Sequence, residues 1–202
     1  WWEVRYPKDG IITANEIHIP TNTSLLFGVE SADVIHDFWV PQLGRKIDVV
    51  PGTHNHIWLS ADQPGTYLGA CAEFCGLEHA WMRIRVIAQK PEEFAQWKQA
   101  QRRTPSSTLS GNAAEGERYF REMTCSNCHT IAGTATSAHI GPDLTHIASR
   151  ETLAAGRISN TPDNLSGWLH NSEAYKPGSH MPNLHLTDEQ RSDLVAYLET
   201  LR

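Results

Sequence analysis

Long apolar runs are absent from the 202 residues of this chain. A helix that crosses a bilayer needs about 18 to 20 consecutive apolar residues, and no stretch comes near that length. The first residues, Trp1 to Pro7, do not have the pattern of a signal peptide. We therefore expect the chain as given to be soluble. It begins abruptly with two tryptophans in what looks like an extended segment, so we also expect it to have been cut from a longer protein with an N-terminal membrane anchor.

A surplus of basic residues is also absent. The formal net charge is -6, with about -2 up to Thr104 and about -4 beyond it. Nucleic-acid-binding proteins concentrate lysine and arginine in one domain or on one face, so we expect no nucleic-acid partner. Phosphate loops, dinucleotide fingerprints and nucleophile elbows are missing as well, and nothing points to other enzyme chemistry.

The periodicity of apolar residues changes near the middle of the chain. Short runs of β-forming residues, separated by turn residues, fill the stretch up to about Gln89, and their spacing favours a sandwich or a small barrel. A helix is predicted from Pro91 onward, and polar, breaker-rich residues follow it. We predict a β domain at 1–103, a linker at 104–112 and an α-helical domain at 113–202.

Two predicted elements have one-sided apolar patterns. In the strand at 82–88, apolar residues alternate with Arg83 and Arg85, which is typical of a half-buried strand. The closing helix has Thr187 and Gln190 at capping-box spacing. Its apolar face is predicted to consist of Leu194, Tyr197, Leu198 and Leu201.

Two of the four cysteines, Cys125 and Cys128, stand directly before His129 in the sequence CSNCH. Two thiols at this spacing can add to the vinyl groups of haem, and the histidine can bind the iron. A dithiol redox motif would need a βαβ pattern, and a zinc site would need a second cysteine pair nearby; both are missing. These residues favour one covalently attached haem c.

The second axial ligand of the iron must come from another segment. Met181 lies in KPGSHMPN, where prolines and a glycine make a stiff loop, and a thioether ligand suits electron transfer because it raises the haem potential. The histidines downstream are expected mostly on the solvated surface. The full set of candidates is Met181, His139, His146, His170, His180 and His185.

From about Ser110 to Arg202 the chain resembles class I cytochromes c. The resemblance rests on CSNCH, on GPDL at 141–144, on KPGSHMP, and on Gly116 and Phe120 facing Tyr197. It implies an all-α class I cytochrome c fold with Met181 as the distal ligand. It also implies that the carbonyl group of Pro142 fixes the tautomer of His129.

The other two cysteines belong to CAEFCGLEHAWM, which brings Cys71, Cys75, His79 and Met82 into one loop. A disulfide would close a very small ring and leave His79 and Met82 unexplained, and structural zinc rarely takes a thioether. Thiolate, imidazole and thioether together select copper. A blue-copper site needs only one cysteine, so two thiolates favour two bridged copper ions.

A second histidine ligand must come from another part of the β domain. His36 is predicted to end a strand beside Phe38 and Trp39, whereas the other histidines fit solvent-facing positions. These residues alone make His36 only a modest favourite. The candidates are His18, His36, His54 and His56.

From Trp1 to about Trp97 the chain resembles the periplasmic domain of cytochrome c oxidase subunit II. The motifs are VIHDFWVPQLGRKIDVVPG and PGTYLGACAEFCGLEHAWM. The resemblance implies a cupredoxin-like Greek-key sandwich or barrel that holds the dinuclear copper centre CuA. The matching residues imply that Cys71 and Cys75 bridge the coppers, His36 and His79 bind one copper each, and Met82 and the backbone carbonyl of Glu73 are weak ligands.

The same resemblance assigns roles to three further side chains. The carboxylate of Glu73 would help to hold a magnesium or manganese ion against the catalytic subunit. Trp2 resembles the aromatic cluster through which oxidases accept electrons, although a core tryptophan is an equal alternative. Asp37 departs from the serine of many relatives, and its added charge could shift the potential or the docking without removing copper.

A haem c domain behind a CuA domain resembles subunit II of caa-type haem–copper oxidases. The resemblance implies electron transfer from a donor, such as cytochrome c or a quinol–cytochrome c reductase, through haem c to CuA and on to subunit I. That subunit reduces oxygen and pumps protons, so the fragment alone would transfer electrons without reducing oxygen. The expected location is the bacterial cytoplasmic membrane, with the domain facing the periplasm or the cell exterior.

Two alternatives belong to other classes. A stand-alone two-centre electron carrier would have no membrane helices upstream of Trp1. The CuA domain of a nitrous-oxide reductase would need a large histidine-rich propeller domain, which this sequence lacks.

Overall fold

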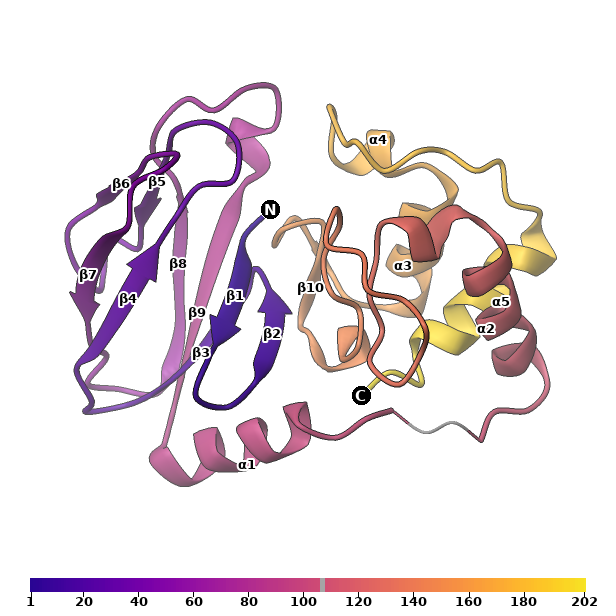
Figure 1. The fold of residues 1–202 in the computed structure, drawn as a ribbon, viewed down its shortest axis with the longest axis horizontal. Coiled ribbons are helices and arrows are strands. Elements are labelled where there is room, and N and C mark those ends of the chain that lie inside the picture. The colour runs from indigo at the N-terminus through magenta and orange to yellow at the C-terminus, as the bar shows by residue number, and fades with distance from the viewer. Residues whose placement is uncertain (106–107) are drawn as a thin grey trace.

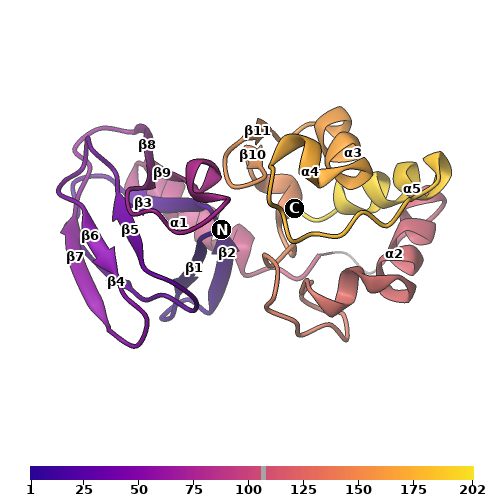
Figure 2. The ribbon, with the colours of Figure 1, turned by 90° about the horizontal axis from the view of Figure 1, so that it is seen from above.

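A computed structural model describes residues 1–105 and 108–202 of the chain. In these ranges the first half is built from strands and the second half mainly from helices. Figures 1 and 2 show two lobes side by side, joined by helix α1 (Pro91–Gln101) and the segment after it. No helix in the described ranges is long and apolar enough to cross a membrane.

The largest sheet of the β lobe has five strands in the order β3–β9–β8–β5–β6. Strands β3 and β9 run parallel, and the other pairs in this sheet run antiparallel. Strand β4 pairs with β7, and β1 pairs with β2. The strands are β1 (Glu3–Tyr6), β2 (Ile11–Ala14), β3 (Glu16–Pro20), β4 (Leu25–Val29), β5 (His36–Trp39), β6 (Ile47–Val49), β7 (Asn55–Leu59), β8 (Gly65–Cys71) and β9 (Arg83–Gln89).

Side chains from facing sheets form the core of this lobe. Phe38 on β5 and Ile84 on β9 are buried in one cluster with Ile57 on β7, so the β4–β7 pair packs on the large sheet. The predicted alternation around β9 is confirmed, since Met82, Ile84 and Val86 are buried while Arg83 is exposed. Period-two burial of this kind removes one face of each strand from water and fixes its register.

Two expectations about histidines in this lobe are wrong. His36 begins strand β5 instead of ending a strand. His18 was expected to face solvent, but its ring stacks on Trp97 of α1 at 4.2 Å between centroids and lies 2.9 Å from Gln89 Oε1. The reason is that α1 packs across β3, which turns an outward-facing position into a half-buried one.

The helical lobe is organised around the crossing of α2 (Asn112–Glu122) and α5 (Asp188–Leu198). The predicted capping box of α5 is confirmed, because Thr187 Oγ1 accepts a hydrogen bond from Gln190 N and Gln190 Oε1 accepts one from Thr187 N. The predicted apolar face is also buried. The other elements are α3 (Pro162–His170), α4 (Ser172–Tyr175), the 3₁₀ segments η1 (His79–Trp81), η2 (Thr124–Asn127) and η3 (Ile147–Ser149), and strands β10 (Thr152–Leu153) and β11 (Ile158–Ser159).

The short hairpin β10–β11 departs from the all-α expectation for this lobe. Its turn, residues 154–156, has three successive positive φ angles, at Ala154, Ala155 and Gly156. Alanine rarely takes this conformation, so no turn signal in the sequence pointed to a hairpin here. The predicted linker includes Ser106 and Ser107, which lie outside the described residues; Leu109, also in that stretch, packs on the helical core.

Replacement of Gly116 on α2 by alanine is expected to destabilise the helical lobe by about 2 kcal/mol or more. A Cβ atom there would lie 2.6 Å from the backbone carbon of Asp193 and 2.7 Å from Tyr197 Cβ, so the two helices would have to separate. Urea unfolding followed by far-UV circular dichroism measures the loss. Gly28→Ala is the matched control because no atom lies within 4 Å of its added Cβ; equal stability of Gly116→Ala and wild type would contradict the close crossing.

The stability of the β lobe is expected to fall as the pH drops below about 6.5, partly through His18. Burial lowers the pKa of His18 from its usual value, although the hydrogen bond with Gln89 opposes the shift. The unfolded chain therefore takes up the proton more readily, and the stability present above the unfolded pKa is lost as the pH falls through the lower folded pKa. Unfolding followed by tryptophan fluorescence at several pH values should show a weaker acid loss for His18→Phe than for wild type. The exposed His56→Gln should keep the wild-type pH dependence.

Candidate metal centres

The segment from Cys71 to Met82, between β8 and β9, carries all the predicted copper ligands except His36. Strand β8 ends at Cys71, the segment η1 begins at His79, and Met82 directly precedes β9. The amide of Cys71 donates a hydrogen bond to the carbonyl oxygen of Met82 at 3.0 Å, so the two ends of the loop are tied together. This closure turns the side chains of one short segment toward a common point.

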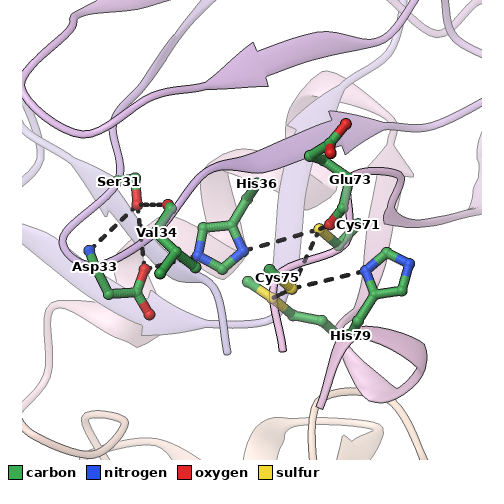
Figure 3. A network of polar contacts seen from close by, with 9 residues as sticks. Ser31, Asp33, Val34, His36, Cys71, Glu73, Cys75 and His79 are labelled. Carbon is green, nitrogen blue, oxygen red and sulfur yellow. Dashed lines mark hydrogen bonds and ion pairs between the residues drawn. The ribbon is translucent and has the colours of Figure 1, made fainter. Parts of the chain in front are cut away.

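The sulfur atoms of Cys71 and Cys75 and a ring nitrogen of His79 lie close together at this loop (Figure 3). The Sγ atoms of Cys71 and Cys75 are 3.7 Å apart, and both cysteines are free. Cys75 Sγ lies 3.7 Å from Nδ1 of His79 and 3.9 Å from Sδ of Met82. Soft donors of these three kinds select copper over zinc, calcium or magnesium.

His36 reaches the same point from strand β5. Phe38 pairs with Cys71 across β5 and β8, and this register sets His36 beside the loop. Its Nδ1 atom lies 3.8 Å from Cys71 Sγ, and the ligand atoms of His36, Cys71 and Cys75 all fall within 4.8 Å of one another. The side chain is buried, whereas His54 and His56 are exposed as expected.

Asp33 is a partner of His36 that the sequence reasoning missed. Its Oδ1 atom lies 2.7 Å from His36 Nε2, and the hydroxyl of Ser31 donates to the same oxygen at 3.2 Å (Figure 3). Burial raises the pKa of Asp33, but the hydrogen bonds with His36, the backbone of Val34 and Ser31, together with the charge of His36, outweigh it and hold that pKa below the usual value. A carboxylate on the outer nitrogen orients the ring and leaves Nδ1 toward the sulfurs. The one sequence signal was a carboxylate three residues before the histidine.

The thiol of Cys75 resists ionisation. Burial, followed by the neighbouring Cys71, raises the pKa of the Cys75 thiol to about 11. Two adjacent thiolates in a partly buried loop need positive charge nearby, and a metal cation supplies it. The chemistry of this donor set therefore fits a bridged metal pair.

The remaining predicted residues of this region surround the cluster. The thiol of Cys71 donates to the carbonyl oxygen of Glu73 at 3.2 Å, while the Glu73 side chain is exposed. The Trp2 ring contacts the edges of His36 and Phe38, with centroids 5.9 Å and 5.7 Å away, and packs against the core. Asp37 is 1 % exposed, its pKa is raised by burial, and its Oδ1 atom has no partner in the described residues.

The second cysteine pair lies at the C-terminal end of α2. Cys125 is in η2, and the amides of Cys128 and His129 both donate to its carbonyl oxygen. His129 Nδ1 lies 2.7 Å from the carbonyl oxygen of Pro142, the contact that the resemblance implied. A carbonyl only accepts, so Nδ1 carries the proton and Nε2 keeps its lone pair. An unprotonated Nε2 on the residue directly after Cys128, with both thiols free, fits the attachment of haem c.

Met181 lies on the loop after α4, in the same lobe as His129. The hydroxyl of Ser172 donates to the Met181 carbonyl oxygen at 3.0 Å, and Met181 N donates to Ser179 Oγ at 3.4 Å. These bonds hold the backbone of the predicted stiff loop. Its pairing with His129 on one iron stays a prediction.

One candidate histidine does not lie on the surface. His146 is 4 % exposed, and its Nε2 atom donates to the carbonyl oxygen of Gln101 at 2.9 Å. The expectation of a solvated residue is wrong because the end of α1 covers this position. The other histidines considered as haem ligands are exposed, namely His139, His170, His180 and His185.

Comparisons with known proteins match both lobes. Residues 8–89 match the family described as cytochrome C oxidase subunit II, periplasmic domain, and residues 113–202 match the cytochrome c family. Cytochrome c oxidase subunit 2 of Alkalihalophilus pseudofirmus is 38% identical over 206 residues, which cover 100% of this chain and 58% of that protein. The subunit 2 of Bacillus subtilis is 32% identical over 213 residues, covering 100% and 60%.

The chain thus spans about three fifths of the length of these relatives. Among solved structures, the periplasmic domain of subunit II of cytochrome oxidase from Bradyrhizobium japonicum is 33% identical. That match covers 50% of this chain and 85% of the other, with a TM-score of 0.48.

Proposed function

The chain joins a domain of the cytochrome c oxidase subunit II family to a cytochrome c domain, and from this premise we propose that it relays electrons within a haem–copper oxidase. Electrons would come from a donor such as cytochrome c or a quinol–cytochrome c reductase, pass by way of haem c and CuA, and leave for catalytic subunit I. Relatives that match over all of this chain support a fused subunit over two separate carriers.

The convergence of six donor groups on one point carries the proposal. Cys71 and Cys75 would bridge a copper pair, His36 and His79 would each bind one copper through Nδ1, and Met82 and the Glu73 carbonyl would bind weakly. Five neighbouring pairs of these ligand atoms lie 3.2 to 3.9 Å apart, which supports this assignment. When bound, such a pair takes up and returns one electron.

The surrounding residues would keep these donors in place. Asp33 holds the outer nitrogen of His36, and the bond from Cys71 N to Met82 O closes the loop. Rigid donors move little when the charge of a centre changes, which favours fast transfer. Trp2, in edge contact with His36, is our candidate for accepting electrons from an external donor.

In the second domain, Cys125 and Cys128 would hold haem c through thioether bonds. His129 and Met181 would bind its iron from opposite faces. The proton on His129 Nδ1, bonded to Pro142 O, supports Nε2 as the ligand atom. A thioether opposite the histidine would keep the iron suited to electron transfer.

We propose the finer architecture on the same grounds. Residues 1–103 would form a cupredoxin-like Greek-key domain with its C-terminal helix, residues 104–112 a linker, and residues 113–202 a class I cytochrome c domain. The exposed Glu73 carboxylate would meet a magnesium or manganese ion at subunit I. The complex would lie in the bacterial cytoplasmic membrane, with both domains facing the periplasm or the cell exterior.

The copper assignment is tested by loading the chain with copper. We expect two copper ions per chain and a purple protein whose paramagnetic resonance spectrum shows one electron shared by two equivalent coppers. Cys75→Ser should lose this spectrum because one bridge is missing, whereas the exposed His54→Asn should keep it. A blue one-copper spectrum, or one zinc without copper uptake, would refute the assignment.

The haem ligand is tested by Met181→Ala. The methionine–iron absorption band of the oxidised haem should disappear, because no other thioether is proposed to reach the iron. His180→Ala changes the neighbouring exposed residue and should leave the band intact. If the band survives in Met181→Ala, another residue is the ligand.

A further inference from the structure

The two loops that carry candidate ligands touch each other across the lobes. Lys176 Nζ, on the loop that leads to Met181, lies 2.8 Å from Oε2 of Glu78, which directly precedes His79. The Lys176 side chain is only 6 % exposed. Gly178 lies against Leu77, since an added Cβ would come within 3.0 Å of Leu77 Cβ. The segment before Met181 is therefore packed on the segment before His79.

The β10–β11 hairpin makes a second set of contacts with the β lobe. Glu16 on β3 is 2 % exposed, and its carboxylate accepts hydrogen bonds from Glu151 N at 3.1 Å, Thr152 N at 2.8 Å and Thr152 Oγ1 at 2.6 Å. Arg85 on β9 donates to the Glu151 carboxylate at 2.5 Å. A buried carboxylate is costly unless it is fully bonded, and here the donors come from the other lobe.

The tip of the hairpin and the end of α1 extend the same surface. The Arg157 guanidinium lies 4.1 Å from the centre of the Trp81 ring. Trp81 ends η1, in the loop between β8 and β9. The positive φ angles of Ala154 and Ala155 are costly for alanine, so surrounding contacts must hold them. At the end of α1, the backbone carbonyl oxygen of Gln101 accepts a hydrogen bond from the buried His146 of the helical lobe.

We propose that these contacts form a docking surface that holds the two domains as one body, and that Glu16 and Lys176 are its positioning residues. Docking is specific, since Lys176 pairs with the carboxylate of Glu78 and the hydrogen bonds to the buried carboxylate of Glu16 all come from the opposite domain. Its purpose, which rests on the proposed function, is to keep the Met181 loop against the His79 loop so that electrons cross between the two centres at a fixed separation.

The test compares three forms of the 202-residue chain with haem attached and copper loaded. They are the wild type, the double variant Glu16→Gln/Lys176→Met, and the control Glu189→Gln/Lys8→Met, which makes the same changes at exposed positions. Small-angle X-ray scattering measures whether the domains stay together. Flash reduction of the haem, followed by optical spectroscopy, measures the rate of electron transfer to copper.

Loss of buried, bonded charges weakens an association by about thirtyfold or more. In the double variant we expect the radius of gyration to rise, the distance distribution to show two separated bodies, and the transfer rate to fall. Both absorption spectra and the circular dichroism should match the wild type, as should every property of the control. Scattering and a transfer rate equal to wild type in the double variant would overturn the proposal.

Four further variants keep the test decisive. If the double variant fails to fold, the single variants Glu16→Gln and Lys176→Met take its place, and unchanged scattering in both would overturn the docking surface. In the exchanged pair Glu78→Lys/Lys176→Glu, docking should recover relative to Lys176→Glu alone. If the wild type binds no copper, the proposed function fails, while scattering of the haem-containing chain still decides on docking.

Discussion

The pairing of β5 with β8 is the constraint on which the candidate copper site depends. Phe38 opposite Cys71 sets His36 beside the β8–β9 loop, with its Nδ1 atom toward the cysteine sulfurs. A shift of one residue would turn Asp37 toward the loop and bury His36 on the other face. The apolar side of β5, with Phe38 in the core, prevents that shift. Hydrophobic burial thus holds a polar site in register.

The candidate ligands come from distant segments in the β domain, whereas three of them come from one short motif in the helical domain. In the β domain, the pairing of β5 with β8 brings His36 to the loop that carries the other candidate copper ligands. In the helical domain, CSNCH places three groups locally, and the bond between His129 and Pro142 orients the ring. The close crossing of α2 and α5 at Gly116 then supports the cysteine pair at the end of α2.

Charged side chains make several of the contacts between the two domains. Glu16, Lys176 and Arg157 all contribute charge, and each has a specific partner in the other domain. Charged contacts of this kind favour one orientation over others more than they raise affinity. The proposed electron relay would need a reproducible separation between its centres, and a fixed orientation would provide it.

Much of this protein could be predicted from local patterns. Period-two alternation predicted the burial around β9, and the capping box predicted the start of α5. The spacing of cysteine, histidine and methionine indicated the two candidate metal centres. These features depend on residues within about one or two turns or strands of each other. The family resemblance, confirmed by the matches to both families, added His36 to the predicted set.

Tertiary structure alone decided what lies between distant segments. Helix α1 covered His18 and His146, whose surroundings are formed by residues 45 to 79 positions away. The hairpin at β10–β11 has its partner, Glu16, 136 residues earlier in the chain. Such contacts leave no periodic signal in the sequence, because they arise only after two separately folded surfaces meet and exclude water. The sequence therefore determined which chemistry each domain can hold, and the packed structure decided how the two are held together.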